Sequence, residues 1–428
     1  MCTKRIRAKL DHIYNDLETN VTRIFERQNL HFALDLVYHS VLRIPFSGEL
    51  KKGYLESLII GDTRCGKTET CKKYLQHYQL GAFAGGEQTT YAGLVGGLEQ
   101  LHSRWVINWG KIPLNNKRLL VIDEMSGMDP EVIAAMSQIR SSGIAEIVKV
   151  RSAKTNARTR LAWFSNPRKS MPVNAFNTGP DIIQNLVKQP EDIARFDFCV
   201  ILAFDDVDNN LINRPYRDEV EHVYTSRRCR DLVLWAWSRE PQHIKISKQA
   251  YEACFSLAKS MYTKYSHSCP LVNPSEQKLK LAKMATALAC RLFSTTDGIN
   301  VLVEKEHVEY VYEWLNEQYD APYFQYDEWS KDHMPEQCLV SVSDVERKLE
   351  EMGSNAVRKL LNLKQITLKD FEDLLNCDRT TARTHVSDLL KNNALNKYYT
   401  AYAKTPAFIK LIKNYMRKPV PVKVESEY

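Results

Sequence analysis

The 428-residue sequence predicts an α/β protein whose main domain has three layers, with helices on both faces of a parallel sheet. Two observations support this fold class. Short apolar runs alternate with stretches of helical periodicity between residues 53 and 204, and such alternation is typical of a three-layer α/β domain. One of the apolar runs leads into a glycine-containing loop and then a helix, which is the usual setting of a phosphate-binding loop.

The elements follow in a simple order. Residues 4–48 have apolar side chains at helical spacing and end in a turn at residues 45–48. From residue 206 to residue 318 the pattern is helical, and residues 319–335, rich in Asp, Tyr and Pro, predict a linker. Between the first two regions, the expected strands are residues 58–60, 119–122, 160–164 and 198–204.

The loop after the first expected strand fits the pattern G-x-x-x-x-G-K-[ST]. Its residues are Gly61, Asp62, Thr63, Arg64, Cys65, Gly66, Lys67 and Thr68. In such a loop the backbone N–H groups surround phosphates, the lysine reaches the β and γ oxygens, and the hydroxyl of Thr68 ligates Mg²⁺. The sequence therefore predicts a site for a nucleoside triphosphate and Mg²⁺.

A second apolar run, residues 118–122, ends in the carboxylates Asp123 and Glu124. This is the pattern of a central parallel strand that opens at a nucleotide site. We expect Asp123 to hold the Mg²⁺ shell and Glu124 to orient and polarise the attacking water. Alone, such a pair more often begins a loop or caps a helix, but the upstream phosphate loop reverses that preference.

Composition and charge limit the classes of protein to which this chain can belong. The chain has 44% apolar residues, enough for two or three cores, and its 59 basic and 52 acidic residues give a net charge of +7, which permits binding to nucleic acid. The ten cysteines form no C-x-x-C pair and no zinc-binding pattern, as in reduced intracellular proteins. No apolar stretch approaches the ~18 residues of a membrane span. We therefore expect a soluble protein without a membrane partner, located in the cytoplasm or, as the alternative, in the nucleus.

The C-terminal region predicts a helix-turn-helix. Residues 366–375 and 379–391 form the two expected helices, and residues 394–399 form a strand-like run typical of a wing. The alternative is a helical hairpin that only packs against the nucleotide-binding domain. The basic residues expected to contact duplex DNA are Arg379, Arg383 and Lys391.

Six further segments occur in a fixed order around the nucleotide motifs. They are Tyr-Ala-Gly-Leu at 91–94, Trp-Val-Ile-Asn-Trp-Gly at 105–110, residues 144–150, Asn-Ala-Arg at 156–158, Phe-Ser-Asn-Pro at 164–167 and Ala-Arg-Phe-Asp at 194–197. Together they resemble the MCM branch of the AAA+ ATPases, the replicative helicases of archaea and eukaryotes. The resemblance implies an α/β AAA+ core with three layers, a helical lid, and ATP with Mg²⁺ as cofactors.

The resemblance also assigns roles to single residues. Asn166 resembles sensor 1, which contacts the attacking water or the γ-phosphate, and Arg195 resembles an arginine finger that acts on a neighbouring subunit. A finger acting in trans implies a ring, expected to be a homo-hexamer. Lys149 matches the hairpin lysine that follows the DNA backbone, and the alternative is a solvated edge ribbon. The hairpin residues expected to contact single-stranded DNA are Lys149, Arg151, Lys154 and Arg158, and Arg160 adds to the basic character of this segment.

The expected organisation is an N-terminal helical segment (1–50), an AAA+ core (51–205), a helical lid (206–318), a linker (319–335), a C-terminal winged-helix domain (336–417) and a basic then acidic tail (418–428). Two departures from the family pattern stand out. The family carries a large N-terminal domain, so residues 1–50 indicate a compact variant or a fragment. Glu276 occupies the place of the sensor 2 arginine, for which Lys278 or Lys280 can substitute.

The chain also resembles the MCM-like initiator helicases that bacterial mobile genetic elements encode. The leading functional prediction is a ring-forming, ATP-dependent DNA helicase that binds an origin through its C-terminal domain. The alternative is an AAA+ replication initiator or DNA-remodelling switch that hydrolyses ATP without processive unwinding. A chaperone or transcription activator is disfavoured because the sequence lacks an aromatic or G-A-F-T-G pore loop.

Overall fold

The computed structural model describes residues 3–87, 89–102, 104–150, 152–168, 171–214, 217–333, 342–363, 365–392, 394–398 and 401–416. The chain divides into two units, Met1–His333 and Met334–Tyr428. Each unit has its own hydrophobic core, and the two cores share no residue. None of the helices within the described ranges is long and apolar enough to cross a bilayer.

A five-stranded parallel sheet forms the centre of the first unit, in the order β11-β3-β10-β7-β4. Every residue of β3, β7, β10 and β11 is buried, as expected when helices cover a parallel sheet. The predicted α/β core is therefore confirmed, together with its four strands. The strands are β3 (Glu56–Gly61), β4 (Ala82–Gly85), β7 (Leu119–Asp123), β10 (Arg160–Ser165) and β11 (Phe198–Leu202).

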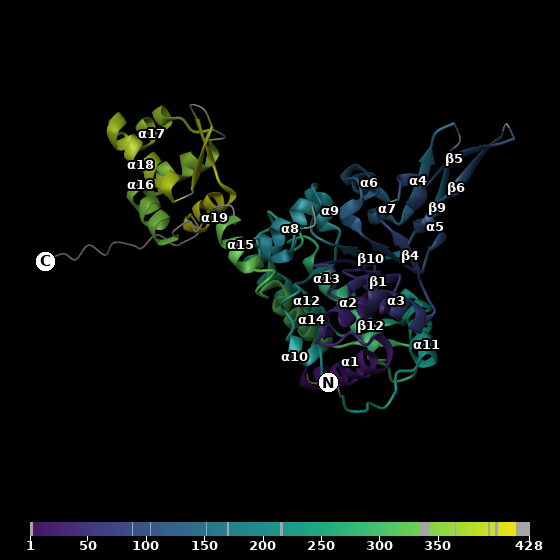
Figure 1. The fold of residues 1–428 in the computed structure, drawn as a ribbon. Helices are drawn as coiled ribbons and strands as arrows, with labels where there is room; N and C mark the ends of the chain where they lie inside the picture. The colour runs from purple at the N-terminus through teal and green to yellow at the C-terminus, as the bar shows by residue number, and fades with distance from the viewer. Residues whose placement is uncertain are drawn as a thin grey trace. The chain divides into compact units, whose positions relative to one another are not determined.

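Helices pack closely against this sheet. Helix α2 (Gln28–His39) lies against β3, β10 and β11, and α3 (Lys67–Tyr78) begins directly after the glycine-containing loop. Figure 1 shows α6, α7 and α9 on the opposite side of β10 from α2 and α3, with α8 beside α9. The bounds of these four helices are Pro130–Ala135 for α6, Ser137–Ser142 for α7, Gly179–Leu186 for α8 and Pro190–Ala194 for α9.

The N-terminal residues belong to the same core. Helix α1 (Thr3–Leu17) and a π-helical turn η1 (Glu18–Thr22) precede α2, and an antiparallel hairpin of β1 (Arg43–Phe46) and β2 (Glu49–Lys52) follows it. Ser47 and Gly48, with φ of 54° and 78°, form the two-residue turn. The described part of segment 1–50 is therefore mainly helical as far as His39 and ends in the hairpin, and its apolar side chains pack into the core of the first unit.

Two further hairpins extend from this unit. A short helix, α4 (Tyr91–Leu94), leads into β5 (Gly96–Leu101) and β6 (Arg104–Trp109), which project from the body in Figure 1. Helix α5 (Lys111–Leu114) then returns the chain to the sheet. The second hairpin pairs β8 (Ile144–Val148) with β9 (Ser152–Asn156) and contains Lys149 and Lys154, two of the residues expected to contact DNA, whereas Arg158 follows it.

The region after the sheet is mainly helical, as predicted. Helix α13 is buried along its length and packs against α2, α12 and α14. A parallel pair, β12 (Ile244–Ile246) with β13 (Val301–Val303), was not predicted. The helices are α10 (Asn209–Ile212), α11 (Ser226–Trp237), α12 (Lys248–Lys264), α13 (Gln277–Arg291) and α14 (Lys305–Tyr319).

Residues 319–333 differ from the linker that we expected. Tyr319, Tyr326 and Trp329 are buried, and α15 (Tyr326–His333) packs against α8. The indole Nε1 of Trp329 donates to the carboxylate of Asp181 at 3.1 Å. The polar composition concealed this packing because aromatic side chains bury a large area even among charged neighbours.

The second unit contains two helices at the positions of the expected helix-turn-helix. Helix α17 (Leu368–Leu375) is capped by Thr367, Asn376 turns the chain at φ 48°, and α18 (Arg379–Lys391) follows. The remaining elements are α16 (Val342–Asn362), which is kinked at Gly353, an antiparallel pair of β14 (Leu395–Tyr398) and β15 (Ala401–Lys404), and α19 (Pro406–Tyr415). The winged-helix assignment and its DNA-binding role remain predictions. The tail 418–428 lies outside the described residues.

Candidate active site

The candidate site lies at the carboxyl ends of three neighbouring strands. Strand β10 pairs with β3 on one side and with β7 on the other. Lys67 is the first residue of α3, directly after the loop that follows β3, while Asn166 follows β10 and β7 ends at Asp123. Since ligands of parallel sheets bind at this edge, the topology brings together the residues that the sequence singled out.

Close packing explains the glycines of the loop. A Cβ on Gly61 would lie 2.6 Å from the carbonyl oxygen of Leu202, and one on Gly66 would lie 2.7 Å from a methyl carbon of Ile24. Gly66 also has a φ of 81°, in the region that favours glycine. The Asp62 carboxylate accepts from the backbone N–H of Val173 at 2.7 Å and of Phe204 at 2.9 Å. The Asp62 side chain therefore anchors the loop, while Thr63 and Arg64 are exposed and Cys65 is buried.

The amine of Lys67 is held inside the loop. Its Nζ donates to the carbonyl oxygens of Gly61 and Asp62, both at 2.7 Å, and to Oδ1 of Asn166 at 2.9 Å. Burial lowers the pKa of Lys67 to about 8, although nearby carboxylates oppose the shift. The contact with Asn166 places the predicted sensor directly beside the lysine that is predicted to bind phosphate.

Thr68 and Asp123 form the second contact of the site. The hydroxyl of Thr68 donates to Oδ2 of Asp123 at 2.7 Å. A hydroxyl and a carboxylate at this separation are the oxygen ligands that a hydrated Mg²⁺ ion uses beside a triphosphate. Other oxygen ligands would come from water and phosphate, so the residues present fit the predicted magnesium ion.

Glu124 follows Asp123 and is exposed. It has a φ of 58°, an unusual value for a non-glycine residue, and its N–H donates to Oδ1 of Asp123 at 2.9 Å. Partial burial raises the pKa of Glu124, and the carboxylates of Glu87 and Asp123 raise it further. A raised pKa and an exposed position suit a carboxylate that accepts a proton from water.

Glu87 and Lys111 lie beside Glu124 but were not among the site residues predicted from the sequence. They line a cavity of about 420 Å³ with Glu124 and Thr89. A Cβ on Gly86 would lie 2.7 Å from the carbonyl oxygens of Asp123 and Glu124, so the chain before Glu87 passes close to the end of β7. The sequence held only a weak signal for this position, a pair of glycines: Gly85 ends the edge strand β4, and Gly86 directly precedes Glu87.

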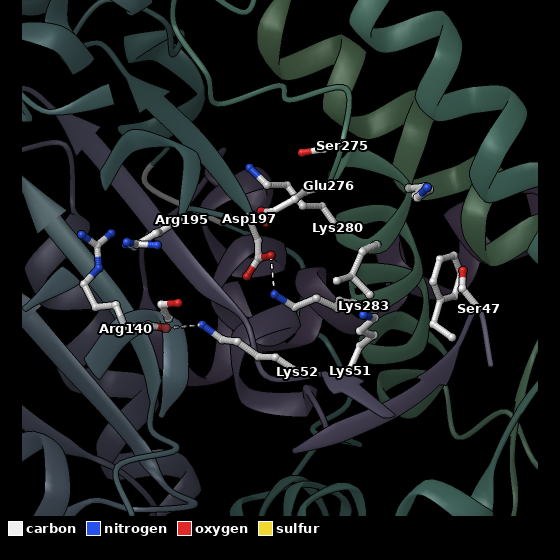
Figure 2. Close-up of a pocket in the computed structure, with 14 residues that line it drawn as sticks. Ser47, Lys51, Lys52, Arg140, Arg195, Asp197, Ser275, Glu276, Lys280 and Lys283 are labelled. Carbon is white, nitrogen blue, oxygen red and sulfur yellow. Dashed lines mark hydrogen bonds and ion pairs between the residues drawn. The ribbon is translucent and has the colours of Figure 1, made fainter. Parts of the chain in front are cut away.

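Arg195 lies apart from this site. It follows α9 and lines a different cavity, of about 570 Å³, which Figure 2 shows between the β1–β2 hairpin and α13. Its guanidinium donates to the hydroxyl of Ser137, with Nε at 2.9 Å, and Nε is 3.6 Å from Oδ1 of Asp192. Within the described ranges, its hydrogen bonds and ion pairs do not reach the residues of the glycine-containing loop.

The candidates for sensor 2 line the same cavity as Arg195. Glu276 directly precedes α13, and Lys278 lies with its Nζ 4.9 Å from the ring centroid of Phe255. Lys280 is buried, and its Nζ donates to the carbonyl oxygens of Phe196 at 2.6 Å and Leu271 at 2.8 Å. These two contacts make Lys280 an internal anchor, so Lys278 is the better placed of the two lysines for a ligand.

The hairpin residues have different surroundings. Lys149 is exposed at the turn between β8 and β9, whereas Arg151 lies outside the described residues. The Nζ of Lys154 is 3.1 Å from a carboxylate oxygen of Glu146. Arg158 is half-buried and donates to Asn116.

The prediction that Arg160 adds to the basic character of the hairpin segment is wrong. Its side chain is fully buried in β10 and donates to the carbonyl oxygens of Ser40 at 2.7 Å and Lys117 at 2.6 Å. The guanidinium carbon also lies 4.6 Å from the ring centroid of Trp237. Arg160 is therefore part of the core.

Two of the three predicted contacts to duplex DNA are on the surface of α18. Arg379 and Arg383 are exposed, and the nearest acidic oxygen to Arg379 belongs to Glu372, at 3.9 Å. Lys391 ends the helix, but its side chain lies outside the described residues. The exposed face of α18 is thus basic at its beginning.

Comparisons with known proteins agree with this geometry. Residues 5–214 match the family model of the MCM P-loop domain. The zygotic DNA replication licensing factor mcm6 of Xenopus tropicalis is 24% identical over 228 residues, which cover 50% of this chain and 27% of that protein. The DNA replication licensing factor MCM6 of Oryza sativa subsp. indica is 23% identical over 252 residues, covering 56% of this chain and 30% of that protein.

The matched part of the chain therefore covers less than a third of the length of each of these two curated relatives. The family match includes the glycine-containing loop, Asp123, Glu124, Asn166 and Arg195. Together, the matching P-loop domain, the two relatives and the parallel sheet with its nucleotide motifs support an MCM-like AAA+ family for this chain.

Proposed function

We propose that the chain is an ATP-dependent DNA helicase that acts in replication as a ring of identical subunits. The observation that carries this proposal is the convergence of Lys67, Asn166, Thr68 and Asp123 at one edge of the sheet, beside the exposed carboxylate of Glu124. In this arrangement Lys67 would bind the β and γ phosphates of ATP, Thr68 and Asp123 would hold Mg²⁺, and Glu124 would activate water. Bound Mg²⁺ would neutralise phosphate charge.

A ring would explain the position of Arg195. Arginine fingers stabilise the charge of the transition state, and many are supplied by a second chain. Arg195 lies in a cavity separate from Lys67, with its guanidinium partly exposed. We therefore assign it to the nucleotide of a neighbouring subunit, and we propose a hexamer on the basis of the resemblance to the MCM family.

DNA would bind at two places. The exposed Lys149 at the turn of the β8–β9 hairpin would contact the backbone of single-stranded DNA in the ring channel. Arg379 and Arg383 on α18 would contact duplex DNA at an origin. We also propose, from the sequence resemblance alone, that a mobile genetic element encodes the chain. Integrase or excision genes beside its own gene would support this proposal.

Replacing Lys149 with Ala is expected to uncouple ATP use from unwinding. The substitution removes one phosphate contact per subunit, and each lost contact lowers the salt slope of DNA affinity by about one unit. Basal ATPase activity should persist because Lys149 is in the hairpin and not in the nucleotide site. Strand separation and DNA-free ATPase activity, measured on the same preparation, would test this expectation.

Lys248→Ala is the matched control for this experiment. Lys248 is also highly exposed but lies at the first position of α12, in the helical region after the sheet. We expect the control to unwind DNA normally. Normal unwinding by the Lys149→Ala protein would contradict the channel role of Lys149. ATPase activity without strand separation in the unsubstituted protein would favour the initiator or remodelling switch, which needs no cation in a channel.

Truncation after His333 is expected to remove sequence-selective binding and to retain DNA-stimulated ATPase activity. The cut falls between two units with separate cores. The double substitution Arg379→Ala with Arg383→Ala should give the same loss in the full chain, with a salt slope smaller by about two units if both arginines contact phosphates. Binding to duplexes of different sequence measures both changes. Unaltered selectivity in both proteins would exclude the second unit as the origin reader.

A further inference from the structure

A buried set of polar contacts connects β3 with the helix that precedes Arg195. The guanidinium of Arg140, on α7, donates from Nε to Oε1 of Glu56 at 2.6 Å and from Nη1 to Oδ1 of Asp192 at 3.0 Å. Its Nη2 also donates to the backbone oxygen of Asp192 at 3.1 Å. The side chains of all three residues are at most 3% exposed. This geometry ties α7 to both β3 and α9.

Arg195 is attached to one end of these contacts. Oδ1 of Asp192, which accepts from Arg140, is also 3.6 Å from Nε of Arg195. The hydroxyl of Ser137 accepts from Nε of Arg195 at 2.9 Å and from Nη2 at 2.5 Å. Ser137 and Arg140 are three residues apart on α7, so they lie on neighbouring positions of one helix face. Figure 2 shows Arg140 and Arg195 on the same side of the cavity.

The other end reaches the strands that carry the chain's own nucleotide site. Glu56 is the first residue of β3, which leads to Gly61 and Lys67. Its Oε1 also accepts from the indole Nε1 of Trp163 at 2.9 Å, and Trp163 lies on β10, three residues before Asn166. Glu56 thus connects β3, on which it lies, with β10, and these are two of the three strands that end at the candidate site.

Such a buried network is poorly explained by stability alone. Buried ion pairs often contribute little net stability because desolvation of the charges offsets their attraction. The planar guanidinium of Arg140 does, however, fix the geometry of the groups that it binds. Arg195 is a long side chain with 26% exposure, and free rotation about its bonds would leave its guanidinium spread over many positions.

We propose that Arg140, Asp192 and Ser137 form a positioning relay that holds the guanidinium of Arg195 in the orientation needed for a neighbouring subunit's nucleotide. The inference rests on the proposed function of Arg195 in trans. Glu56 connects this relay to β3 and β10, so the finger of each subunit is braced against the strands of that subunit's own nucleotide site. The relay residues position Arg195 and do not contact ATP.

The first test is a double-mutant cycle on the full chain. Ser137→Ala removes only the hydroxyl that Arg195 binds, and we expect it to lower kcat by about tenfold or more, because small displacements of a catalytic group have large kinetic effects. The KM for ATP should change little. In an Arg195→Ala background, Ser137→Ala should cause no further loss, since it acts through Arg195. Asp192→Asn, which preserves side-chain volume, provides a second variant with the same expected pattern.

A matched control addresses general destabilisation. Asp35 is a buried carboxylate paired with Arg291 at 2.5 Å, on α2 and α13, outside the relay. Any effect of Asp35→Asn should be the same in the wild-type and Arg195→Ala backgrounds. A Ser137→Ala effect that persists undiminished in the Arg195→Ala background would overturn the relay.

Mixed rings separate the relay from the proposed function. Glu124→Gln subunits retain the finger, and Arg195→Ala subunits retain the nucleotide site, so mixing the two inactive proteins should restore ATPase activity. Random mixing at equal amounts leaves about one quarter of the interfaces complete. Ser137→Ala protein should likewise gain activity from Glu124→Gln partners and not from Arg195→Ala partners. If Glu124→Gln and Arg195→Ala proteins do not restore activity together, the role of Arg195 in trans is overturned. If they do, but Ser137→Ala protein gains no activity from Glu124→Gln partners, only the relay is overturned.

Discussion

Replacing Glu124 with Gln is expected to abolish ATP turnover while ATP still binds. The amide has the shape of the carboxylate but cannot accept a proton from water, and loss of a general base typically costs about 10²–10⁴-fold in rate. Nucleotide and Mg²⁺ would still be held, because Lys67, Thr68 and Asp123 keep their contacts. Turnover under saturating ATP and the Kd for ATP, measured on one preparation, give the two halves of this prediction.

Glu87→Gln is the informative control for Glu124. Both carboxylates line one cavity, and the charge of Glu87 contributes to the raised pKa of Glu124. A base with a raised pKa becomes protonated, and the rate falls, at a higher pH than for an ordinary glutamate. Removing the charge of Glu87 should therefore preserve turnover and move this acid limb to lower pH. If Glu87→Gln abolished turnover and Glu124→Gln did not, Glu87 would be the base.

Replacing Arg195 with Ala is expected to lower ATPase activity by a factor on the order of 10³ at most, the lower range for arginine fingers. The loss should appear mainly in kcat, because Lys67 and Thr68 still bind the nucleotide. Lys51→Ala provides a control, since Lys51 lines the same cavity and is paired with Glu49 on the hairpin. A smaller effect of Lys51→Ala would show that a general loss of positive charge does not explain the Arg195 result.

The trans role of Arg195 also predicts a disproportionate effect in mixtures. Arg195→Ala protein added to wild-type protein would remove the finger from interfaces of mixed rings, so activity should fall faster than the wild-type fraction. A linear decrease with dilution would mean that each subunit hydrolyses ATP alone. ATPase activity at constant total protein and increasing variant fraction measures this dependence.

Much of the core could be predicted because its strands are fully buried. β3, β7, β10 and β11 appear in the sequence as apolar runs, and motif residues directly follow β3, β7 and β10. The edge strand β4 has no such run, since its four residues are Ala, Phe, Ala and Gly and only Ala84 is buried. Short edge strands lack a pattern that distinguishes them from loops.

Buried charged residues are the second feature that could not be predicted from the sequence. Arg160 resembles its basic neighbours in sequence, yet carbonyl oxygens from distant segments accept its hydrogen bonds. Glu56, Arg140 and Asp192 are likewise far apart in sequence and meet only in the fold. A single sequence contains no periodicity that reports such contacts, so neither the burial of Arg160 nor the contacts behind Arg195 could be predicted.

The central claim is that this chain works as a ring in which each subunit completes its neighbour's nucleotide site. Native mass spectrometry of the Glu124→Gln protein, which retains ATP, tests it most directly when run with and without ATP and single-stranded DNA. We predict that ATP and DNA together convert the 49.5-kDa chain into a hexamer. A protein that binds ATP and remains monomeric under all four conditions would contradict the claim.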